Sequence, residues 1–321
     1  MPLADLLPRF RADLERLAGP PSTLGVAVSG GADSLALLLL AHTAYPGRVR
    51  AATVDHKLRP ESAGEAAHVA RICAAIGCPH DVLAADVLRG GDGLQGEARR
   101  ARYAALREWA RAHGIGLLLT AHHADDQAET IMLRLRRGSG LAGLAGIRAV
   151  RPEGEGLTLV RPLLGWRRGE LAVLVAEAGV EAVDDPSNAD PRFDRAAMRR
   201  FLADAPGLAP SRLARSASAL GEAEEALAWT ADRLAEERCT AGEGAWTIDP
   251  AGLPRELRRR LLARTVAAIR ARHGLTGGRS EDVEGLLAAL EQGATATLAG
   301  VMARGGTLWR LEVAPPRKSG A

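Results

Sequence analysis

A short polar segment follows the apolar run Leu24–Val28 and precedes a Leu- and Ala-rich stretch. It consists of Ser29, Gly30, Gly31, Ala32, Asp33 and Ser34. Glycines after a strand let backbone N–H groups turn toward an anion, and the positive end of the next helix adds to the attraction. The hydroxyls of Ser29 and Ser34 are further donors to phosphate oxygens. The segment predicts a phosphate site, in preference to a glycine turn with an aspartate cap at Asp33.

The type of phosphate loop follows from what the segment lacks. No lysine of the Walker A kind follows the glycines, and the spacing is not the GxGxxG of dinucleotide-binding folds. SGGADS instead resembles the PP-loop of the ATP pyrophosphatase superfamily, whose members cleave ATP between the α and β phosphates. The resemblance implies ATP and Mg²⁺ as the cofactors.

A second polar segment, Thr120–Thr130, follows the apolar run that begins at Gly116. His122 is expected in the turn after a strand, while Asp126 and Glu129 are three residues apart and share one helix face. Two carboxylates there suit Mg²⁺ or a cationic amine. A metalloenzyme cluster of the two histidines and the neighbouring aspartates is the alternative, but neither HExxH nor a soft third ligand accompanies it.

Two further segments carry charges that suit a nucleotide. Val54 ends an apolar run and is followed by Asp55, His56 and Lys57, so His56 is expected to bind phosphate or to order a loop over the nucleotide. The alternative is a polar loop that caps the next helix. In the run Gly96–Tyr103 the arginines read as a solvated helix face, apart from Arg102, which we assign to the phosphates.

The polar segments lie within a stretch, Leu24–Arg137, in which short apolar runs alternate with longer helical patterns. The pattern predicts βαβ units and hence an α/β fold with a doubly wound, Rossmann-like parallel sheet, in which ligands bind at the carboxyl ends of the strands. After Arg137 we expect a Gly-rich loop, a hairpin of 147–150 with 157–160, and a helix ending at Gly179. The expected strands and helices before it are 24–28, 34–44, 49–54, 65–76, 81–86, 96–113, 116–120 and 125–136.

Prolines at 206 and 210 suggest a domain boundary. We expect a catalytic domain at 1–205 and a smaller, mostly helical domain at 206–321, with helices at 211–238, 254–273 and 281–290 and short β-like runs after them. The helix at 254–273 carries seven arginines, which bind phosphate or are simply solvated.

Composition excludes several classes of protein. The 321 residues carry a net charge of +3, and all but two of the 42 basic residues are arginine. Arginine binds phosphate well, but this composition is only weak support for a phosphate-rich partner. Three cysteines without a CxxC pair exclude a disulfide scaffold and favour a reducing, cytoplasmic setting. No run reaches the roughly 18 uncharged residues of a membrane span, and the N-terminus reads as an amphipathic helix, not a secretion signal.

Seven segments in order resemble the tRNA(Ile)-lysidine synthetases over about residues 24–200. They are SGGADS, VDHKLRPES, EARRARY, TAHHADDQAET, RRGSGLAGLAGI, RPLL and DDPSN. That family uses ATP to adenylate C2 of the wobble cytidine in the CAU anticodon of tRNA(Ile), and L-lysine then displaces AMP. The chain would be a short form with one C-terminal tRNA-binding domain.

The resemblance also implies roles for single residues. Asp33 would assist Mg²⁺ and phosphate binding, His56 and Arg102 would contact the nucleotide, and backbone near Ala27 and Val54 would flank the adenine. Asp126 and Glu129 would hold the ammonium of lysine, with Asp125 and His122 nearby. Which group accepts the proton of the lysine amine stays open.

For tRNA, the resemblance points to the Gly-rich stretch 136–147 as the part that reaches the anticodon. A basic stretch extends this surface through Arg167, Arg168, Arg192, Arg195 and Arg199, and the alternative for each of these residues is a solvated surface position. Ala196 stands where the family pattern has asparagine, and this difference concerns local contacts with tRNA or within a dimer. Whether the protein forms a homodimer is not decided by the sequence. A sulfur-inserting PP-loop enzyme acting on tRNA, an amide-forming PP-loop ligase and a non-catalytic nucleotide-responsive RNA-binding protein are the alternatives. The first needs catalytic cysteines or an iron–sulfur cluster, and the last gains nothing from carboxylates at a polyanion site.

Overall fold

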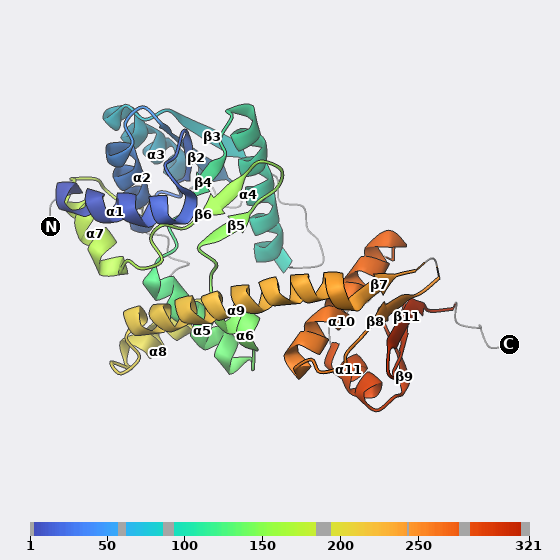
Figure 1. The fold of residues 1–321 in the computed structure, drawn as a ribbon. Helices are drawn as coiled ribbons and strands as arrows, with labels where there is room; N and C mark the ends of the chain where they lie inside the picture. Colours follow the sequence, from blue (N-terminus) through green and yellow to red (C-terminus); the bar gives the residue numbers. More distant parts are fainter. Residues whose placement is uncertain are drawn as a thin grey trace. The chain divides into compact units, whose positions relative to one another are not determined.

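The computed structural model describes residues 3–56, 62–85, 93–183, 194–242, 244–275 and 283–315. The chain divides into two compact units, Met1–Gly221 and Glu222–Ala321, each with its own sheet and hydrophobic core (Figure 1). The division falls within one long helix, α9 (Pro210–Arg238). The boundary expected at 205/206 stays a prediction.

The first unit is built on a six-stranded sheet in the order β3-β2-β1-β4-β6-β5. All neighbouring strands are parallel except β5, which is antiparallel to β6. The predicted doubly wound sheet and the hairpin at its edge are therefore confirmed. The strands are β1 (Leu24–Ala27), β2 (Val49–Asp55), β3 (His80–Ala84), β4 (Leu117–Leu119), β5 (Val150–Pro152) and β6 (Thr158–Val160).

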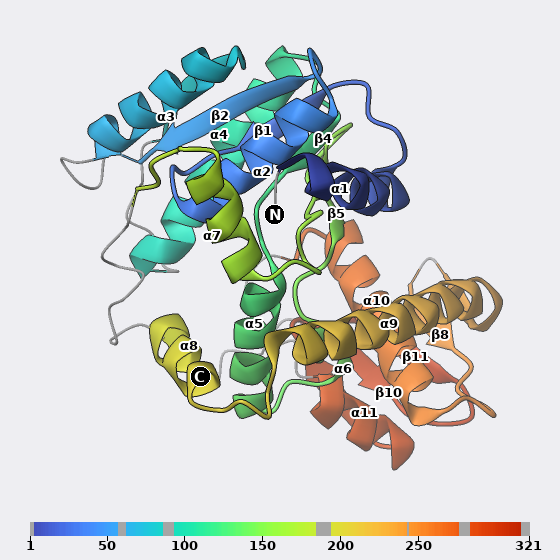
Figure 2. The same cartoon turned by 90° about the vertical axis from the view of Figure 1, so that its left-hand side faces the viewer.

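Helices cover both faces of this sheet, as Figure 2 shows. One core contains buried residues of α1 (Leu3–Ala18), α2 (Ala32–Ala44), α3 (Ser62–Ile76) and α7 (Arg168–Glu177). The other core is formed with α4 (Gly93–Ala112). Strand alternation explains the split, because Val26 faces the first core whereas Gly25 faces Trp109 of α4. A Cβ at Gly25 would lie 2.9 Å from the Trp109 ring, so only glycine allows this close packing.

Three further helices lie beyond the carboxyl edge of the strands. They are α5 (Ala124–Arg136), α6 (Leu141–Leu144) and α8 (Asp194–Ala203). Helices α5 and α8 lie side by side and share a small apolar cluster (Figure 2). The stretch 136–147, expected to be a Gly-rich loop, contains α6 and is bound to α5.

Two side chains of α5 fasten this stretch. Gln127 donates from Nε2 to the Ile147 carbonyl at 2.9 Å and accepts from the Ile147 amide at 2.6 Å. Arg134 donates to the carbonyl of Gly146 at 2.8 Å. The segment from 138 to 147 therefore has a defined position on α5 instead of being a free loop.

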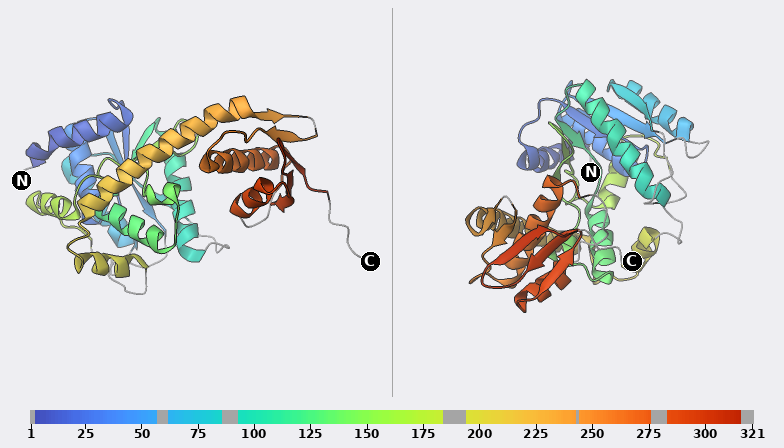
Figure 3. Two further views of the ribbon diagram at one scale, coloured as in Figure 1. Left: turned by 60° about the horizontal axis from the view of Figure 1, so that its bottom comes forward. Right: turned by 90° about the vertical axis from the view of Figure 1, so that its right-hand side faces the viewer.

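The second unit, orange to red in Figure 3, combines helices with a five-stranded antiparallel sheet. Besides the end of α9 it has α10 (Arg255–Arg272) and α11 (Val283–Glu291). The sheet order is β7-β8-β11-β10-β9, with β7 (Cys239–Ala241), β8 (Trp246–Ile248), β9 (Thr295–Leu298), β10 (Val301–Arg304) and β11 (Trp309–Val313). The sequence indicated the last strands but not β7 and β8, which have three residues each. No described helix has the length and apolar character of a membrane span.

Candidate active site

A cavity of about 450 Å³ lies at the carboxyl ends of β1, β2 and β4. Nine of the residues predicted for the site line it, namely Ala27, Ser29, Asp33, Ser34, Val54, His56, Arg102, His122 and Asp126. Gly30, Gly31, Ala32 and Glu129 do not line it. Residues that the sequence did not single out also contribute, among them Thr53, Thr120, Tyr103 and Glu65. The carboxyl ends of parallel strands meet at one edge, which explains why motifs far apart in the sequence surround one cavity.

The phosphate loop is closed by its own serines. Ser34 donates from Oγ to the Gly31 carbonyl at 2.9 Å and accepts from the amide and the hydroxyl of Ser29 at 3.1 and 3.2 Å. Both hydroxyl protons are therefore used within the loop and do not point at a ligand. Gly30 has a φ of +89°, which favours glycine. The amides of Ser34 and Leu35 donate to the Gly31 carbonyl, both at 3.1 Å. The donors left for an anion in the first turn of α2 are therefore the amides of Ala32 and Asp33.

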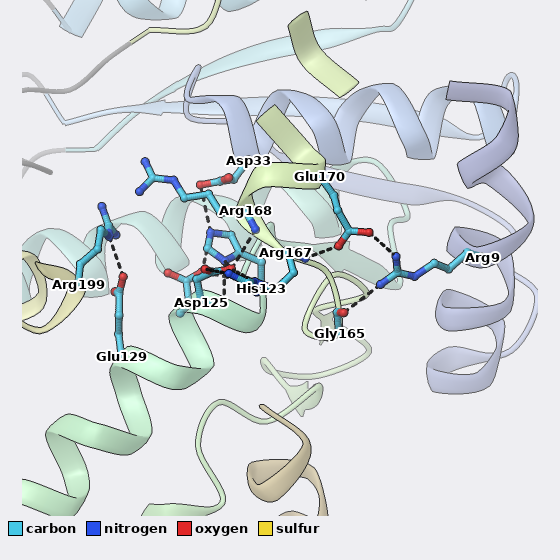
Figure 4. A network of polar contacts seen from close by, with 11 residues as sticks. Arg9, Asp33, His123, Asp125, Glu129, Gly165, Arg167, Arg168, Glu170 and Arg199 are labelled. Atoms are coloured by element: carbon cyan, nitrogen blue, oxygen red, sulfur yellow. Dashed lines mark hydrogen bonds and ion pairs between the residues drawn. The ribbon is translucent and has the colours of Figure 1, made fainter. Parts of the chain in front are cut away.

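His123 connects the phosphate loop to the acidic helix α5, as Figure 4 shows. Its Nε2 lies 3.3 Å from Oδ2 of Asp33 and 3.6 Å from Oδ2 of Asp126. Its Nδ1 accepts from the amide of Asp125 at 3.2 Å, and Asp126 accepts from the amide of His123, so the two residues cap α5 reciprocally. Burial alone would lower the pKa of His123, but the hydrogen bond to Asp33 and the charges of three aspartates raise it.

Asp33 and the histidines do not form a preformed metal cluster. Oδ1 of Asp33 is buried and has no hydrogen-bond partner among the described residues. Across the described part of the chain, no group of three or more His, Cys, Asp or Glu side chains could hold a metal ion.

The two carboxylates expected to converge have different surroundings. Asp126 lines the cavity, whereas the Glu129 side chain is 2% exposed and accepts from Nε of Arg199 at 2.7 Å (Figure 4). The second oxygen of Glu129 is buried without a partner in the described structure. Arg199 comes from α8, which packs against α5. Glu129 is thus not among the residues that line the cavity, and it pairs with an arginine that the sequence assigned to tRNA.

The carboxylate of Asp125 is bound by residues at the start of α7. It accepts from Nε and Nη2 of Arg167, both at 3.2 Å, and from the amide of Arg168 at 2.9 Å. Burial would raise the pKa of Asp125, but these hydrogen bonds and the Arg167 charge outweigh it and lower the pKa. Asp125 therefore joins α5 to the start of α7. Arg167, predicted as a tRNA contact, is engaged in this pair.

His122 lies among cations. Its Nδ1 is 3.1 Å from Oγ1 of Thr120 and 3.3 Å from Nε of Arg161. Burial and then the positive charges of nearby arginines lower its pKa to about 3; the arginines are Arg161, Arg99, Arg195 and Arg102. The sequence assigned no role in the site to Arg161, although this residue begins the RPLL segment and directly follows the buried strand β6.

His56 and Arg102 both line the cavity and lie near enough for their charges to interact. Burial and then the Arg102 charge lower the pKa of His56, and burial and then the Arg99 charge lower that of Arg102. The guanidinium of Arg102 is 5.9 Å from the ring centroid of Tyr103. Lys57, Arg192 and the DDPSN segment lie outside the described residues.

The arginine-rich helix α10 is not a free basic surface. Leu257, Leu261, Leu262, Val266 and Ile269 are buried on one side. Five of its arginines pair with carboxylates of the second unit, in the pairs Arg255–Glu291, Arg258–Glu291, Arg259–Glu256, Arg260–Glu224 and Arg264–Asp232. Much of the charge predicted to meet phosphate is thus offset within the fold.

Comparisons with known proteins match both the PP-loop domain and nearly the whole chain. A family model of the PP-loop domain matches residues 7–205. The tRNA(Ile)-lysidine synthase of Zymomonas mobilis is 44% identical over 98% of this chain and 96% of that relative. The chain belongs to the tRNA(Ile)-lysidine synthase family. The tRNA(Ile)-lysidine synthase of Novosphingobium aromaticivorans is 48% identical over 97% of this chain and 94% of the relative.

Membership of the tRNA(Ile)-lysidine synthase family makes the chain a PP-loop enzyme, for which the use of ATP is implied. The U34-tRNA thiolase of Methanococcus maripaludis, solved with its [4Fe-4S] cluster, has a TM-score of 0.55 and 16% identity over 70% of this chain and 78% of that one. This likeness shows the fold alone. Cys73 and Cys78 are buried, and neither they nor Cys239 line the cavity, so sulfur insertion gains no support.

Proposed function

We propose that this protein uses ATP and L-lysine to convert the wobble cytidine in the CAU anticodon of tRNA(Ile) to lysidine. In the first step the C2 carbonyl oxygen of cytosine attacks the α-phosphorus, and pyrophosphate leaves. In the second step the lysine amine attacks C2, loses a proton, and AMP leaves with the oxygen. The cavity that gathers the phosphate loop, the cationic wall and Asp126 carries the proposal.

Each part of the nucleotide can be assigned to particular residues of the site. Adenine lies between the backbone near Ala27 and Val54, which line neighbouring strand ends. The β and γ phosphates meet the N–H groups at the start of α2, where the helix dipole favours negative charge. Arg102 and His56 face the nucleotide from the other side. Since burial and Arg102 lower the pKa of His56, it binds as a neutral ring.

The residues present fit a magnesium ion. Oδ1 of Asp33 is a buried carboxylate oxygen without a partner among the described residues, and it lies beside the phosphate loop. Mg²⁺ is commonly bound by one or two carboxylates together with substrate phosphates, so one aspartate is sufficient. Asp33 would hold the ion, which supplies charge neutralisation at the phosphates. His123 holds the other oxygen of Asp33 in place.

We propose that the carboxylates of Asp126 and Glu129 bind the ammonium group of the substrate lysine. Asp126 reaches the cavity, and Glu129 has one oxygen without a partner in the described structure. The amine must lose a proton before it attacks. The pKa of about 3 makes His122 a poor acceptor, which supports a carboxylate in this role.

For the tRNA, we propose two regions. The stretch 138–147, held on α5 by Gln127 and Arg134, meets the anticodon loop. The domain at 206–321 holds other parts of the tRNA. In it Trp229 is 61% exposed, with Arg233 5.0 Å from its ring centroid, an arrangement on which a nucleobase can stack. A homodimer and a cytoplasmic location stay predictions.

The test combines the full-length protein with ATP, radiolabelled lysine and an unmodified tRNA(Ile) transcript that has a CAU anticodon. We expect label in the RNA and one AMP released per lysine incorporated. A transcript with uridine at the wobble position is the control and should take up no label. AMP release without lysine in the RNA, or label in the control, would contradict the proposal.

A further inference from the structure

The hydrogen bonds of His122 determine which ring nitrogen carries its proton. Nδ1 lies 3.3 Å from Nε of Arg161. A guanidinium N–H can only donate, so Nδ1 must accept. The Thr120 hydroxyl, 3.1 Å from the same nitrogen, is then a second donor. The ring proton therefore resides on Nε2, to which none of the described residues bonds, on a side chain that lines the cavity.

Arg161 is held firmly enough to impose this tautomer. It directly follows β6, is 3% exposed, and donates from Nη1 to the Arg148 carbonyl at 2.5 Å. No carboxylate among the described residues forms an ion pair with it. Burial is the first cause that lowers the pKa of Arg161, with Arg151 and Arg99 adding to it. A buried guanidinium fixed by a carbonyl has little freedom to turn away from His122.

The surroundings of His122 favour an anionic ligand. The charged groups that face it are Arg161 after β6, Arg99 and Arg102 on α4, and Arg195 on α8. Three carboxylates, Asp33, Glu65 and Asp126, line the same cavity, but the charges that act on the pKa of His122 are those of the arginines. In such a field a neutral imidazole stays neutral, and its Nε2–H is complementary to an oxygen that carries or gains negative charge.

We propose that Arg161 is a positioning residue that holds His122 as a neutral Nε2–H donor, and that this donor binds a non-bridging oxygen of the α-phosphoryl group. The identity of the phosphoryl group rests on the proposed function. In that reaction a bond forms between the cytosine oxygen and the α-phosphorus, and the bond to pyrophosphate breaks. The same phosphoryl oxygens remain in adenylated RNA and in AMP, so one donor serves both steps.

The tautomer is tested by NMR on protein labelled with ¹⁵N-histidine, with His122 assigned from the His122→Gln variant. We expect Nε2–H and no protonation of the ring above about pH 5. In Arg161→Gln we expect the titration to move toward the ordinary histidine range. Arg148→Gln is the matched control, because it removes a neighbouring exposed charge and keeps the carbonyl that holds Arg161. Wild-type protein with Nδ1–H, or a ring that titrates near pH 6, would overturn the proposal.

The ligand is tested with AMP and adenosine, which differ by the α-phosphoryl group. His122→Asn, whose amide is too short to replace Nε2, should bind AMP about tenfold more weakly and adenosine as before. His122→Gln, which returns a donor near Nε2, should recover most of the loss. Unchanged AMP affinity in His122→Asn would refute the phosphoryl assignment, even if adenylation were slow. Because these readouts need no RNA, wild-type protein that binds AMP this way but forms no lysidine would refute the proposed function alone.

Discussion

Arg199 donates from Nε to Oε1 of Glu129 at 2.7 Å and leaves the second oxygen of that buried carboxylate without a partner in the described structure. The two residues are 70 positions apart and come from the packed helices α8 and α5. Burial would lower the pKa of Arg199, but the hydrogen bond to Glu129 and the carboxylate charges raise it. The pair holds one oxygen of Glu129, and the other oxygen is the one that the proposed function assigns to the lysine ammonium.

Replacing Glu129 should separate the two chemical steps. In Glu129→Gln we expect adenylated tRNA to form at a near-normal rate and to accumulate, because the amide has lost the charge that attracts the lysine ammonium. Rapid-quench analysis with α-³²P-labelled ATP measures the intermediate. Glu225→Gln, at an exposed position of α9, is the control. If both steps were slowed equally, Glu129 would not act in lysine binding.

Asp33→Asn should abolish the first step. The substitution keeps the size of the side chain but removes the negative charge beside the phosphate loop and at Nε2 of His123. We expect pyrophosphate release with tRNA and ATP to fall by at least about a hundredfold, as for the loss of one strong electrostatic contact. Pyrophosphate release at the wild-type rate over a range of Mg²⁺ concentrations would exclude Asp33 from metal and phosphate binding.

His122 should make the fold less stable in acid. Its pKa is about 3 in the folded chain and 6.5 ordinarily, so the unfolded state binds more protons between these values. Stability is fully present above pH 6.5 and is lost as the pH falls toward 3, by about 1.4 kcal/mol per pH unit. The difference in free energy of unfolding between wild type and His122→Gln, measured with urea, should therefore shrink between about pH 6 and about pH 4. With the exposed His273→Gln as control, a constant difference would contradict this expectation.

Gly146→Ala should loosen the anticodon-facing stretch. Gly146 has a φ of +69°, and a Cβ there would overlap Oε1 of Gln127, which accepts from the Ile147 amide. Gly138→Ala is a matched control, since its φ is +68° and no atom lies within 4 Å of the added carbon. We expect the control to lose about 1 kcal/mol of stability from strain alone. Gly146→Ala should lose more and bind a CAU anticodon stem-loop more weakly; equal losses in the two variants would count against the role of Gln127.

Trp229→Ala should weaken tRNA binding. A stacked base is worth about 1–3 kcal/mol, so the Kd for tRNA should rise roughly fivefold or more. The affinity for ATP should not change, because Trp229 does not line the cavity. Trp229→Phe keeps an aromatic face and should retain most of the binding. A filter-binding series at constant salt is sufficient, and equal Kd values for wild type and Trp229→Ala would remove Trp229 from the tRNA surface.

The fold class and the sheet edge at which the cavity forms can be predicted from the amino-acid sequence. Apolar runs such as Leu24–Val28 are buried strands in a parallel sheet, and polar residues that follow such runs must meet where the strands end. Asp33, His56 and His122 could be placed in this way because each follows its strand within a few residues. Their positions depend on local order along the chain.

The contacts of these side chains could not be predicted from the sequence and follow from the packing of distant segments. Glu129 faces Arg199, His122 faces Arg161, and His123 connects Asp33 to α5, because helices and strands distant in the sequence pack together. The sequence does not show whether the arginines of α10 bind phosphate or are paired, because their carboxylate partners come from α9 and α11. Periodicity and motif spacing describe one segment at a time, whereas protonation state, tautomer and charge balance depend on the neighbours that folding supplies.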